Sequence, residues 1–442
     1  MLKKTMTPIL GLLAVLLSVT AAAQSPQIDF EEFTLDNGLH VILHQDNTTP
    51  NIVVNIMYHV GAKNENPERT GFAHFFEHLM FEGSKHIARG EFDLLTERNG
   101  GSNNAFTSFD VTNYYIYFPS NQLELGLWME AERLLHPKID SISIATQKSV
   151  VTEEMKQTRD NQPYGRLLIE TISRAFTQHP YRWDVLGRDE HIRAATDEEI
   201  YAFHDMFYVP NNAVLVVTGD FVPEEARRLV HKYFNDIPRG NHDVYRPRMT
   251  EPLRMHEVRD TVFDNIQLPM VIQAYHIPAR GTEDYYAVDM LGMLLSRGQS
   301  SRLYRKLVVE EQTAMQISAL PLGLEDPGLT IIIGMPNMGV DPAVLESGIN
   351  EEMERVRREL ITGQELEKVK NQVESQFVNS NTTIASRATN LANYHTLFGD
   401  ASLINTELER YLSVTREDIL RVAREYFRED NRVVLYYMPK EQ

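Results

Sequence analysis

Residues 71–83 read Gly-Phe-Ala-His-Phe-Phe-Glu-His-Leu-Met-Phe-Glu-Gly, and within them His74, Glu77 and His78 form the pattern His-x-x-Glu-His. On a helix, residues three and four apart share a face, so these side chains are expected to point the same way. Two imidazoles at this spacing can hold one Zn²⁺, and a carboxylate between them can act on a metal-bound water. This order of residues is a known catalytic zinc pattern. The alternative is an amphipathic helix with two histidines beside an apolar stripe.

A zinc site on this helix needs a third protein ligand, and a catalytic site also keeps one position open for water. The chain contains no Cys, which excludes thiolate ligands and disulfides. A carboxylate from a second helix is the natural source, and the helix expected at 144–158 carries Glu153 and Glu154. Two imidazoles and a carboxylate suit Zn²⁺, although Mn²⁺ or Co²⁺ can take the same ligands. Six histidines are isolated in the sequence and are expected to be structural or exposed rather than ligands: His59, His86, His136, His179, His204 and His276.

The length and charge of the chain exclude some classes of protein. A chain of 442 residues is longer than one hydrophobic core usually supports, so two domains are expected. Lys and Arg number 43 against 62 Asp and Glu, which gives a net charge of −19. That balance argues against nucleic acid as a partner. It suits solubility, and it leaves open an attraction for basic substrates.

Residues 1–23 have the layout of a secretory signal peptide. Two lysines at 3–4 form a positive region, residues 9–19 are mostly apolar, and the alanines at 21–23 form an A-x-A site. The apolar run is too short to be interpreted as a spanning helix, and an uncleaved anchor is the alternative. No later segment is apolar enough to span a bilayer. We therefore expect cleavage near Ala23-Gln24 and secretion, to the periplasm in a Gram-negative source, with no membrane attachment afterwards.

The second half of the chain repeats the first. Residues 196–217 align with residues 415–436 at a constant offset of 219 (415 − 196), with identities at Thr196/Thr415, Ile200/Ile419, Asn212/Asn431 and Val214/Val433. Earlier in each half, Tyr-His-Val-x-Ala at 58–62 corresponds to Tyr-His-Ile-x-Ala at 275–279. The pattern predicts a duplicated α/β domain, with chance similarity of two helix–strand units as the alternative.

The expected boundaries are an N-terminal zinc-binding domain at 24–240, a Pro-containing linker at 241–255 and a C-terminal domain at 256–442. Where the first domain has the metal motif, the second has an apolar helix near 288–295. Only the first half is therefore expected to bind zinc, while the second supplies packing or substrate contacts.

These residues resemble the pitrilysin family of zinc peptidases, which includes insulin-degrading enzyme and mitochondrial processing peptidase. The resemblance covers nearly the whole mature chain and is strongest at residues 74–81, 99–101 (Asn-Gly-Gly), 104–108 (Asn-Ala-Phe-Thr-Ser) and 154–166. It implies an α+β fold of two homologous α/β domains, each a mostly antiparallel sheet with helices packed on one face. Together the two domains would form half of a peptidase chamber. A chain of this length with one zinc-binding half is similar to the small, two-domain members that work as dimers.

The resemblance also implies roles for residues on the second helix. The family's third zinc ligand is a Glu on a later helix, and Glu154, which lies 76 residues after His78 (154 − 78), matches it better than Glu153 does. A further Glu of the family supports the metal from outside the ligand shell, and here its position is Gln147. That departure is expected to weaken the outer-sphere support of the metal rather than to remove the metal.

A third implied element is the strand at 104–108. In the family the matching strand is a sheet edge to which the substrate peptide adds as an extra strand, and this pairing gives affinity without demanding a particular sequence. The resemblance therefore implies substrate contacts from Asn104, Ala105, Phe106 and Thr107. The alternative is an ordinary internal strand.

One departure from the family concerns the second half. Active members commonly carry an Arg and a Tyr there that bind the substrate. In this chain the Tyr position is Met315, and the Arg position is Val308 or Val309, depending on register. Two explanations remain open. A homologous zinc-less subunit supplies the pair in a heterodimer, with a homodimer as the other assembly, or this chain binds zinc but cleaves weakly.

These expectations define a zinc-dependent endopeptidase that hydrolyses peptides or unfolded protein segments. His74, His78 and Glu154 would hold one Zn²⁺ per chain. Glu77 would take a proton from the metal-bound water and pass it to the departing amine. The alternative is a zinc-binding but catalytically weak subunit, structural or chaperone-like, of a peptidase-related complex.

Overall fold

A computed structural model of the protein describes residues 27–440. The expected signal peptide and the cleavage site at Ala23-Gln24 lie outside the described residues. Among residues 27–440, no helix combines the length and the apolar character needed to cross a membrane.

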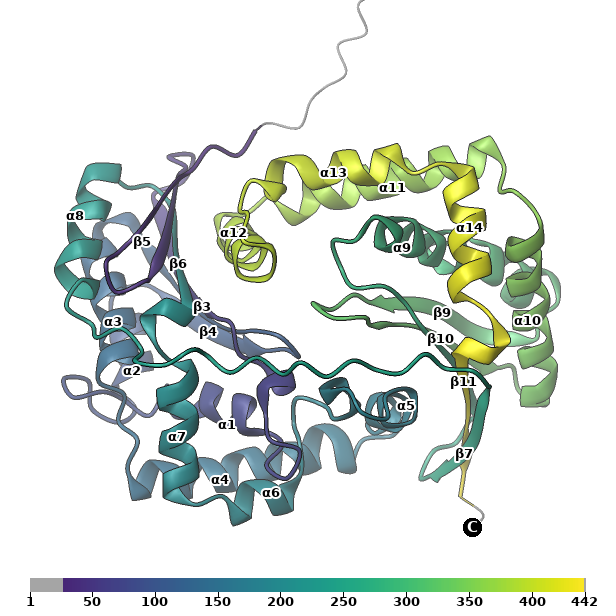
Figure 1. Ribbon diagram of the computed structural model, residues 1–442, viewed down its shortest axis with the longest axis horizontal. Coiled ribbons are helices and arrows are strands. Elements are labelled where there is room, and N and C mark those ends of the chain that lie inside the picture. Colours follow the sequence, from purple (N-terminus) through teal and green to yellow (C-terminus); the bar gives the residue numbers. More distant parts are fainter. Residues whose placement is uncertain (1–26, 441–442) are drawn as a thin grey trace, which may run out of the picture.

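The first half of the chain is built on a six-stranded sheet with the order β1-β2-β6-β3-β5-β4 (Figure 1). The β2–β6 pair is parallel, and the other pairs are antiparallel. Its strands are β1 (Glu31–Thr34), β2 (His40–Gln45), β3 (Asn51–Tyr58), β4 (Ser102–Thr107), β5 (Thr112–Pro119) and β6 (Ala213–Gly219). The mostly antiparallel sheet implied by the resemblance is therefore present.

The helices of the first half are α1 (Phe72–Leu79), α2 (Glu91–Arg98), α3 (Leu123–Leu135), α4 (Ser141–Met155), α5 (Leu167–Ala175), α6 (Asp189–Ala194), α7 (Asp197–Phe207) and α8 (Pro223–Phe234). All of them except α5 contribute to the core on one face of this sheet. Successive strand residues point to opposite faces, and on β3 Val54 and Ile56 join the helix-side core. Their neighbours Val53 and Met57 join a separate core on the other face. β3 reads as a nearly continuous apolar run because both of its faces are covered.

The second half repeats this topology with five strands in the order β7-β11-β8-β10-β9. β7 and β11 are parallel, and the remaining pairs are antiparallel, as in β2-β6-β3-β5-β4. The strands are β7 (Val258–Asp264), β8 (Met270–His276), β9 (Ala314–Leu322), β10 (Leu329–Pro336) and β11 (Arg432–Pro439). The helices are α9 (Glu283–Ser296), α10 (Pro342–Arg358), α11 (Gly363–Ser380), α12 (Ile384–Phe398), α13 (Leu403–Ser413) and α14 (Arg416–Tyr426). The shared order confirms the expected duplication.

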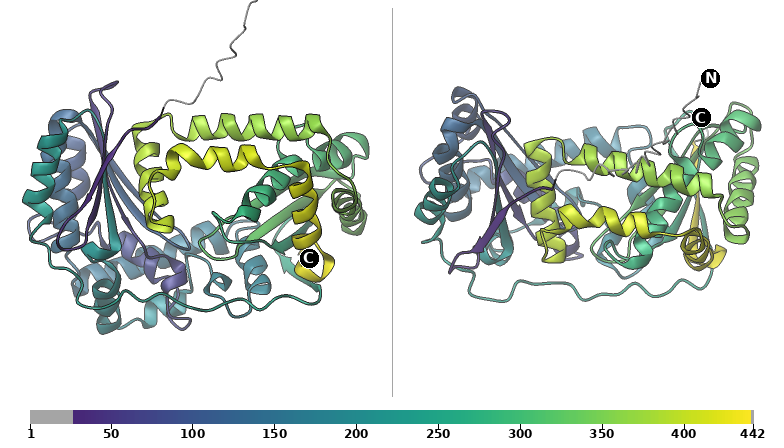
Figure 2. Two further views of the ribbon diagram at one scale, coloured as in Figure 1. Left: turned by 45° about the horizontal axis from the view of Figure 1, so that its top comes forward. Right: turned by 90° about the horizontal axis from the view of Figure 1, so that it is seen from above.

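The two halves exchange helices. α12, from the second half, packs on the open face of the first sheet, where Ile384 and Leu391 join the core formed with Val53 (Figure 2). In return, α5 from the first half packs on the second sheet, where Ile172 joins the core formed with Ile272. Each half therefore covers apolar surface of the other. No local sequence pattern predicted this exchange.

An extended connection joins the two halves. Residues 235–257, between α8 and β7, contain no helix or strand and run across the molecule (Figure 1). The linker was expected inside this segment, at 241–255. The domain boundaries at 240 and 256 stay a prediction, because helices of each half pack on the sheet of the other.

A buried ion-pair cluster also links the halves. Lys63, just after β3 and only 4% exposed, donates to Glu325 at 2.5 Å and to Asp326 at 3.2 Å in the β9–β10 loop. Its Nζ also lies 3.1 Å from the carboxylate of Asp110. Burial alone would raise the pKa of Glu325, but hydrogen bonds and charges from His59 and Lys63 outweigh it and lower this pKa to about 2. The cluster fixes the β9–β10 loop of one half against the β3 end of the other.

Replacing Lys63 by Met should destabilise the protein by roughly 3–5 kcal/mol, because the buried Asp110 and the partly exposed Glu325 and Asp326 would lose their shared cation. The measurement is the free energy of unfolding in urea. Lys306→Met is the matched control, since it removes a pair with Glu351, whose side chain is 65% exposed. That control should cost less than about 1 kcal/mol. Equal effects of the two variants would contradict a structural role for the cluster.

Candidate metal centre

The helix that carries the motif, α1, is held by hydrogen bonds at its N-terminus and by packing of one face against the core. Gly71 precedes it with φ +94°, a conformation that favours glycine. The Glu65 carboxylate accepts the backbone N–H groups of Gly71 and Ala73, each at 2.8 Å, and so satisfies donors that have no partner within the helix. Phe75 and Leu79 bury the opposite face in the first-half core. The helix predicted around the motif is thus confirmed.

The structure brings three predicted ligands together. Nε2 of His78 lies 3.3 Å from Nε2 of His74 and 3.2 Å from Oε2 of Glu154, and the His74–Glu154 distance is 3.7 Å. The two imidazole planes are nearly perpendicular, at 84°. Ligand atoms about 2.0–2.2 Å from a tetrahedral zinc ion would lie roughly 3.3–3.6 Å apart. The triangle formed by these three atoms therefore fits a zinc ion.

Both imidazoles are in the neutral form that can bind a metal cation. Burial, together with the neighbouring His78, lowers the pKa of His74 to about 3. Burial also lowers the pKa of His78, although Glu154 acts in the opposite direction. Both rings are therefore neutral near pH 7, the form that binds metal. Nδ1 of His74 is buried and has no hydrogen-bond partner among the described residues.

Glu77 lies on the same helix and is held from the neighbouring sheet. The Thr107 hydroxyl, at the end of β4, donates to Oε2 of Glu77 at 2.6 Å. Burial raises the pKa of Glu77, the Thr107 hydrogen bond lowers it, and the nearby Glu154 raises it again. The net upward shift makes this carboxylate a stronger base than an exposed Glu. The contact between Thr107 and Glu77 has no counterpart in the sequence pattern.

Of the two candidate carboxylates on α4, only one faces the histidines. Glu153 pairs with Lys156 at 3.3 Å, and its side chain is 57% exposed. Glu154 instead faces the two histidines. Gln147 lies two turns earlier on α4 and donates to Glu82 at 2.6 Å. Among the hydrogen bonds of the described residues, none joins Gln147 to a candidate ligand, so its outer-sphere role stays a prediction.

β4 occupies the edge of the first sheet, so the internal-strand alternative is wrong. The N–H of Ala105 is bound by the side chain of its neighbour Asn104 at 2.9 Å, rather than by β5. This donor consequently points to the free edge of the strand. Phe106 is 37% exposed on the same strand. The role of these residues in substrate binding stays a prediction.

The six histidines that are isolated in the sequence are not all isolated in the structure. His86 and His136 converge with Glu132. His59 and His179 contact Glu325 and Asp326 of the second half. Glu132 and His136 are four residues apart on α3 and its end, a spacing that could have been recognised as a pair. The contacts with His86, Glu325 and Asp326 join distant parts of the chain and left no local signal.

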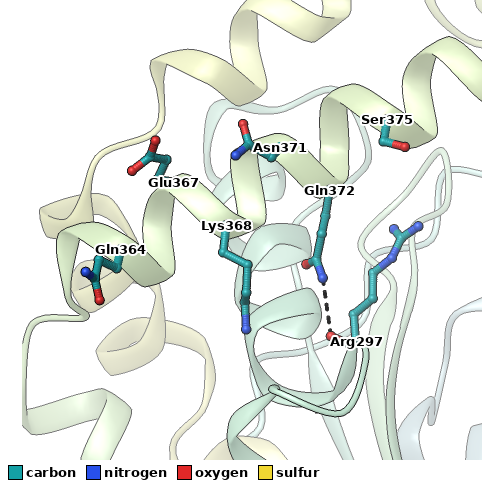
Figure 3. A pocket seen from close by; sticks show the side chains of 7 residues that line it. All are labelled: Arg297, Gln364, Glu367, Lys368, Asn371, Gln372 and Ser375. Atoms are coloured by element: carbon teal, nitrogen blue, oxygen red, sulfur yellow. Dashed lines mark hydrogen bonds between the residues drawn. The ribbon is translucent and has the colours of Figure 1, made fainter.

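A polar hollow lies elsewhere, in the second half (Figure 3). It is lined by Arg297 and by residues of α11, where the Nε2 of Gln372 donates to the carbonyl of Arg297 at 3.4 Å. The other lining residues are Gln364, Glu367, Lys368, Asn371 and Ser375. None of the candidate metal ligands lines it.

Comparison with known proteins places this geometry in a family. The profile described as Insulinase (Peptidase family M16) matches residues 40–187, and the profile described as Peptidase M16 inactive domain matches residues 194–373. Zinc protease PqqE of Helicobacter pylori is 32% identical over 438 residues, which cover 98% of each chain. The chain belongs to peptidase family M16. The resemblance to the pitrilysin family is thereby confirmed.

Other members of family M16 agree with this placement. A Bacillus subtilis protein described as an uncharacterized zinc protease, YmxG, is 23% identical over 407 residues, which cover 92% of this chain and 97% of that protein. The crystal structure of a protease from Helicobacter pylori matches with a TM-score of 0.89 at 30% identity, and it covers 93% of this chain and 100% of that one. These matches confirm the expected fold class, two homologous α/β domains that form half of a chamber. The matching relatives are named zinc proteases, which is consistent with zinc as the metal.

Replacing Glu154 by Gln should cost the chain one equivalent of zinc, because an amide is a weaker ligand than a carboxylate and leaves the two imidazoles without an anionic partner. The measurement is the zinc content after dialysis against a weak chelator. Glu153→Gln is the matched control on the adjacent residue, and it should keep the wild-type zinc content. Equal zinc in the two variants would show that Glu154 is not a ligand.

Proposed function

We propose that this M16 chain is a zinc-dependent endopeptidase that acts on peptides or unfolded protein segments. One observation carries the proposal: three ligand atoms from His74, His78 and Glu154 converge at zinc-binding distances, with the Glu77 carboxylate on the same helix. A structural zinc site usually has four protein ligands, whereas three leave a position for water.

The residues of this site divide the chemistry between them. His74, His78 and Glu154 would hold one Zn²⁺, which supplies Lewis acidity that makes water nucleophilic near neutral pH and polarises a peptide carbonyl. Glu77 accepts the proton of the attacking water and returns it to the departing amine. Thr107 orients the Glu77 carboxylate through its hydroxyl. A buried carboxylate with a raised pKa suits both halves of this proton transfer.

The substrate is proposed to add to the free edge of β4. The strand ends at Thr107, which contacts the base, so a peptide paired along it would pass beside Glu77. Asn104, Ala105 and Phe106 would provide this platform, with the N–H of Ala105 as a donor to the peptide backbone. Backbone pairing binds extended chains of many sequences, which favours unfolded segments over folded proteins.

We further propose that a second subunit completes the chamber. Met315, on the edge strand β9, is 45% exposed at the position where the resemblance implies a Tyr. The implied Arg position is Val308 or Val309, depending on register, and Val309 is 55% exposed. A homologous zinc-less subunit with the Arg/Tyr pair would supply these groups, and a homodimer is the other assembly. If neither assembly forms an active chamber, the same residues favour a zinc-binding but catalytically weak subunit. The signal-peptide pattern at residues 1–23 supports a secreted, periplasmic location.

Replacing Glu77 by Gln should leave the zinc content unchanged and lower kcat by roughly 10²–10⁴-fold, because the amide cannot accept the proton. The assay follows a quenched peptide, with and without a chelator. It is run on the chain alone and, where a neighbouring reading frame encodes a homologous zinc-less chain, on a mixture of the two. Glu97→Gln changes an exposed Glu of α2 and should keep full activity. Wild-type turnover in Glu77→Gln would refute the assignment, and inactivity of both wild-type preparations would favour the weak subunit.

Replacing Ala105 by Pro should lower kcat/KM for peptides by roughly 2- to 13-fold, the equivalent of one lost hydrogen bond of about 0.5–1.5 kcal/mol. Proline is tolerated on an edge strand where its nitrogen faces away from the sheet. Ala105→Val keeps the N–H and serves as the control, with thermal unfolding to verify that both variants fold. If both variants reduce kcat/KM equally, the side chain rather than the backbone donor is responsible.

A further inference from the structure

We infer that His86, Glu132 and His136 form a second site for a divalent transition metal, outside the hydrolytic centre. Glu132 lies in the last turn of α3, His136 follows its end, and His86 belongs to the loop that follows α1. One ligand atom from each residue lies within 4.8 Å of the other two. Two imidazoles and a carboxylate form a donor set that Zn²⁺ accepts.

The arrangement resembles that of the α1 site. Oε1 of Glu132 is hydrogen-bonded to Nδ1 of His86 at 2.8 Å, a distance that would lengthen when both atoms bind one ion, and lies 3.7 Å from Nδ1 of His136. The two rings are nearly perpendicular, at 86°, with centroids 5.9 Å apart. The corresponding pair on α1 makes an angle of 84° at 4.8 Å. In both places one carboxylate oxygen lies between two imidazole nitrogens, and the lone pairs of crossed rings can meet at one ion.

The carboxylate at this second site is held in place by its surroundings. The side chain of Glu132 is only 8% exposed, and its other oxygen, Oε2, accepts a hydrogen bond of 2.7 Å from the Ser84 hydroxyl. Ser84 Oγ in turn accepts the N–H groups of His86 and Ile87, at 3.2 and 3.1 Å. A ligating carboxylate supported in this way is typical of metal sites.

Backbone contacts fix the loop that carries His86 against the end of α3. The N–H of Lys85 donates to the carbonyl of His136 at 3.1 Å, and the N–H of Lys138 donates to the carbonyl of Gly83 at 2.9 Å. The two segments that carry the ligands are therefore joined before any ion binds. This preorganisation reduces the entropy cost of binding a metal ion.

One donor atom at this site lacks a partner. Nδ1 of His136 is buried and makes no hydrogen bond within the part of the chain that the structure describes. It faces Glu132 at 3.7 Å, too far for a hydrogen bond but suitable for a shared cation. The side chain of His86 is 53% exposed, so an ion can enter from solution.

Another trio, Glu32, His40 and His395, meets the same distance criterion but has the wrong geometry. Its two imidazoles are stacked, with centroids 3.5 Å apart and planes at 8°. Lone pairs of parallel stacked rings run side by side and do not converge on one ion. The crossed rings of His86 and His136 therefore make the better metal site.

The expected effect of the ion is structural. Ser84, which holds Glu132, lies six residues after His78 (84 − 78), directly beyond α1. Arg133 already joins the two helices by donating to the carbonyl of Met80 at 3.1 Å. A metal bound here would add a second link between the exit of the catalytic helix and the end of α3.

The test is zinc stoichiometry in untagged protein equilibrated with excess Zn²⁺ and freed of unbound ion. The wild type should hold two zinc ions, His74→Ala/His78→Ala should hold one, and His86→Ala should also hold one. All three changes together should abolish binding. His242→Ala, at an exposed histidine, is the control and should hold two. A wild type with one zinc, or no zinc in His74→Ala/His78→Ala, would overturn the second site while leaving the proposed peptidase centre untested by that result.

Thermal unfolding gives a second measurement that does not depend on activity. A ligand that binds only the folded state raises the unfolding temperature. In the His74→Ala/His78→Ala background, Zn²⁺ should therefore raise Tm, and adding His86→Ala should remove the shift. Without zinc, adding His86→Ala should lower Tm only slightly, because it removes one hydrogen bond from a half-exposed histidine to Glu132. A zinc-induced shift that survives His86→Ala would contradict the proposal.

Discussion

The mutual covering of two sheets is the constraint on which the rest of the structure depends. Each sheet packs its own helices on one face and needs another layer on the other, because β3 and β8 are apolar on both faces. α12 and α5 supply these layers across the boundary between the halves. Removing a single large apolar side chain from such a core typically costs about 2–5 kcal/mol of unfolding free energy. Separating the two halves would expose many such side chains, so each half depends on the other for its stability. The exchange therefore makes one rigid frame from two repeats.

That frame determines where charged groups can be placed. Burial disfavours charge, so the histidines of α1 are neutral, and each buried carboxylate needs a cation or hydrogen-bond donors. Lys63 serves Glu325 and Asp326 in this way between the halves. Near α1, Thr107 provides a donor for Glu77, whereas Glu154 lies beside two neutral imidazoles and close to the Glu77 carboxylate. A divalent cation is the group that this local charge distribution lacks.

Much of the fold could be predicted from the sequence where the pattern is local. The strand β3 and the helices α2 and α3 are of this kind, because the periodicity or the turn residues that define them lie within the segment itself. The helix expected at 144–158 ends earlier, at Met155, where a wider helical turn over Lys156–Asp160 follows. His74, Glu77 and His78 were predictable because their spacing places them on one face.

The rest of the site depended on contacts between distant segments. Choosing Glu154 over Glu153 required the family resemblance, since both belong to one helix and only the direction of packing separates them. The hydrogen bond from Thr107 to Glu77 joins residues 30 positions apart, and the exchange of α5 and α12 joins the two halves. The pairing of His86 with Glu132 spans 46 positions. No local pattern encodes such contacts.

Comparison of the two repeats shows why, within the described residues, the candidate metal centre belongs to only one of them. At the offset of 217 that relates Tyr58 to Tyr275 (275 − 58), His74, Glu77 and His78 correspond to Leu291, Leu294 and Leu295 of α9. All three leucines are at most 1% exposed and belong to the second-half core. At the same offset Glu154 falls at Asn371 of α11, which lines the polar hollow of Figure 3, and at the offset of 219 (373 − 154) it falls at Val373. The helix face that is polar in the first repeat is therefore apolar and buried in the second repeat. Because those leucines help to hold the second-half core, the frame gains stability from one repeat and retains a reactive surface on the other.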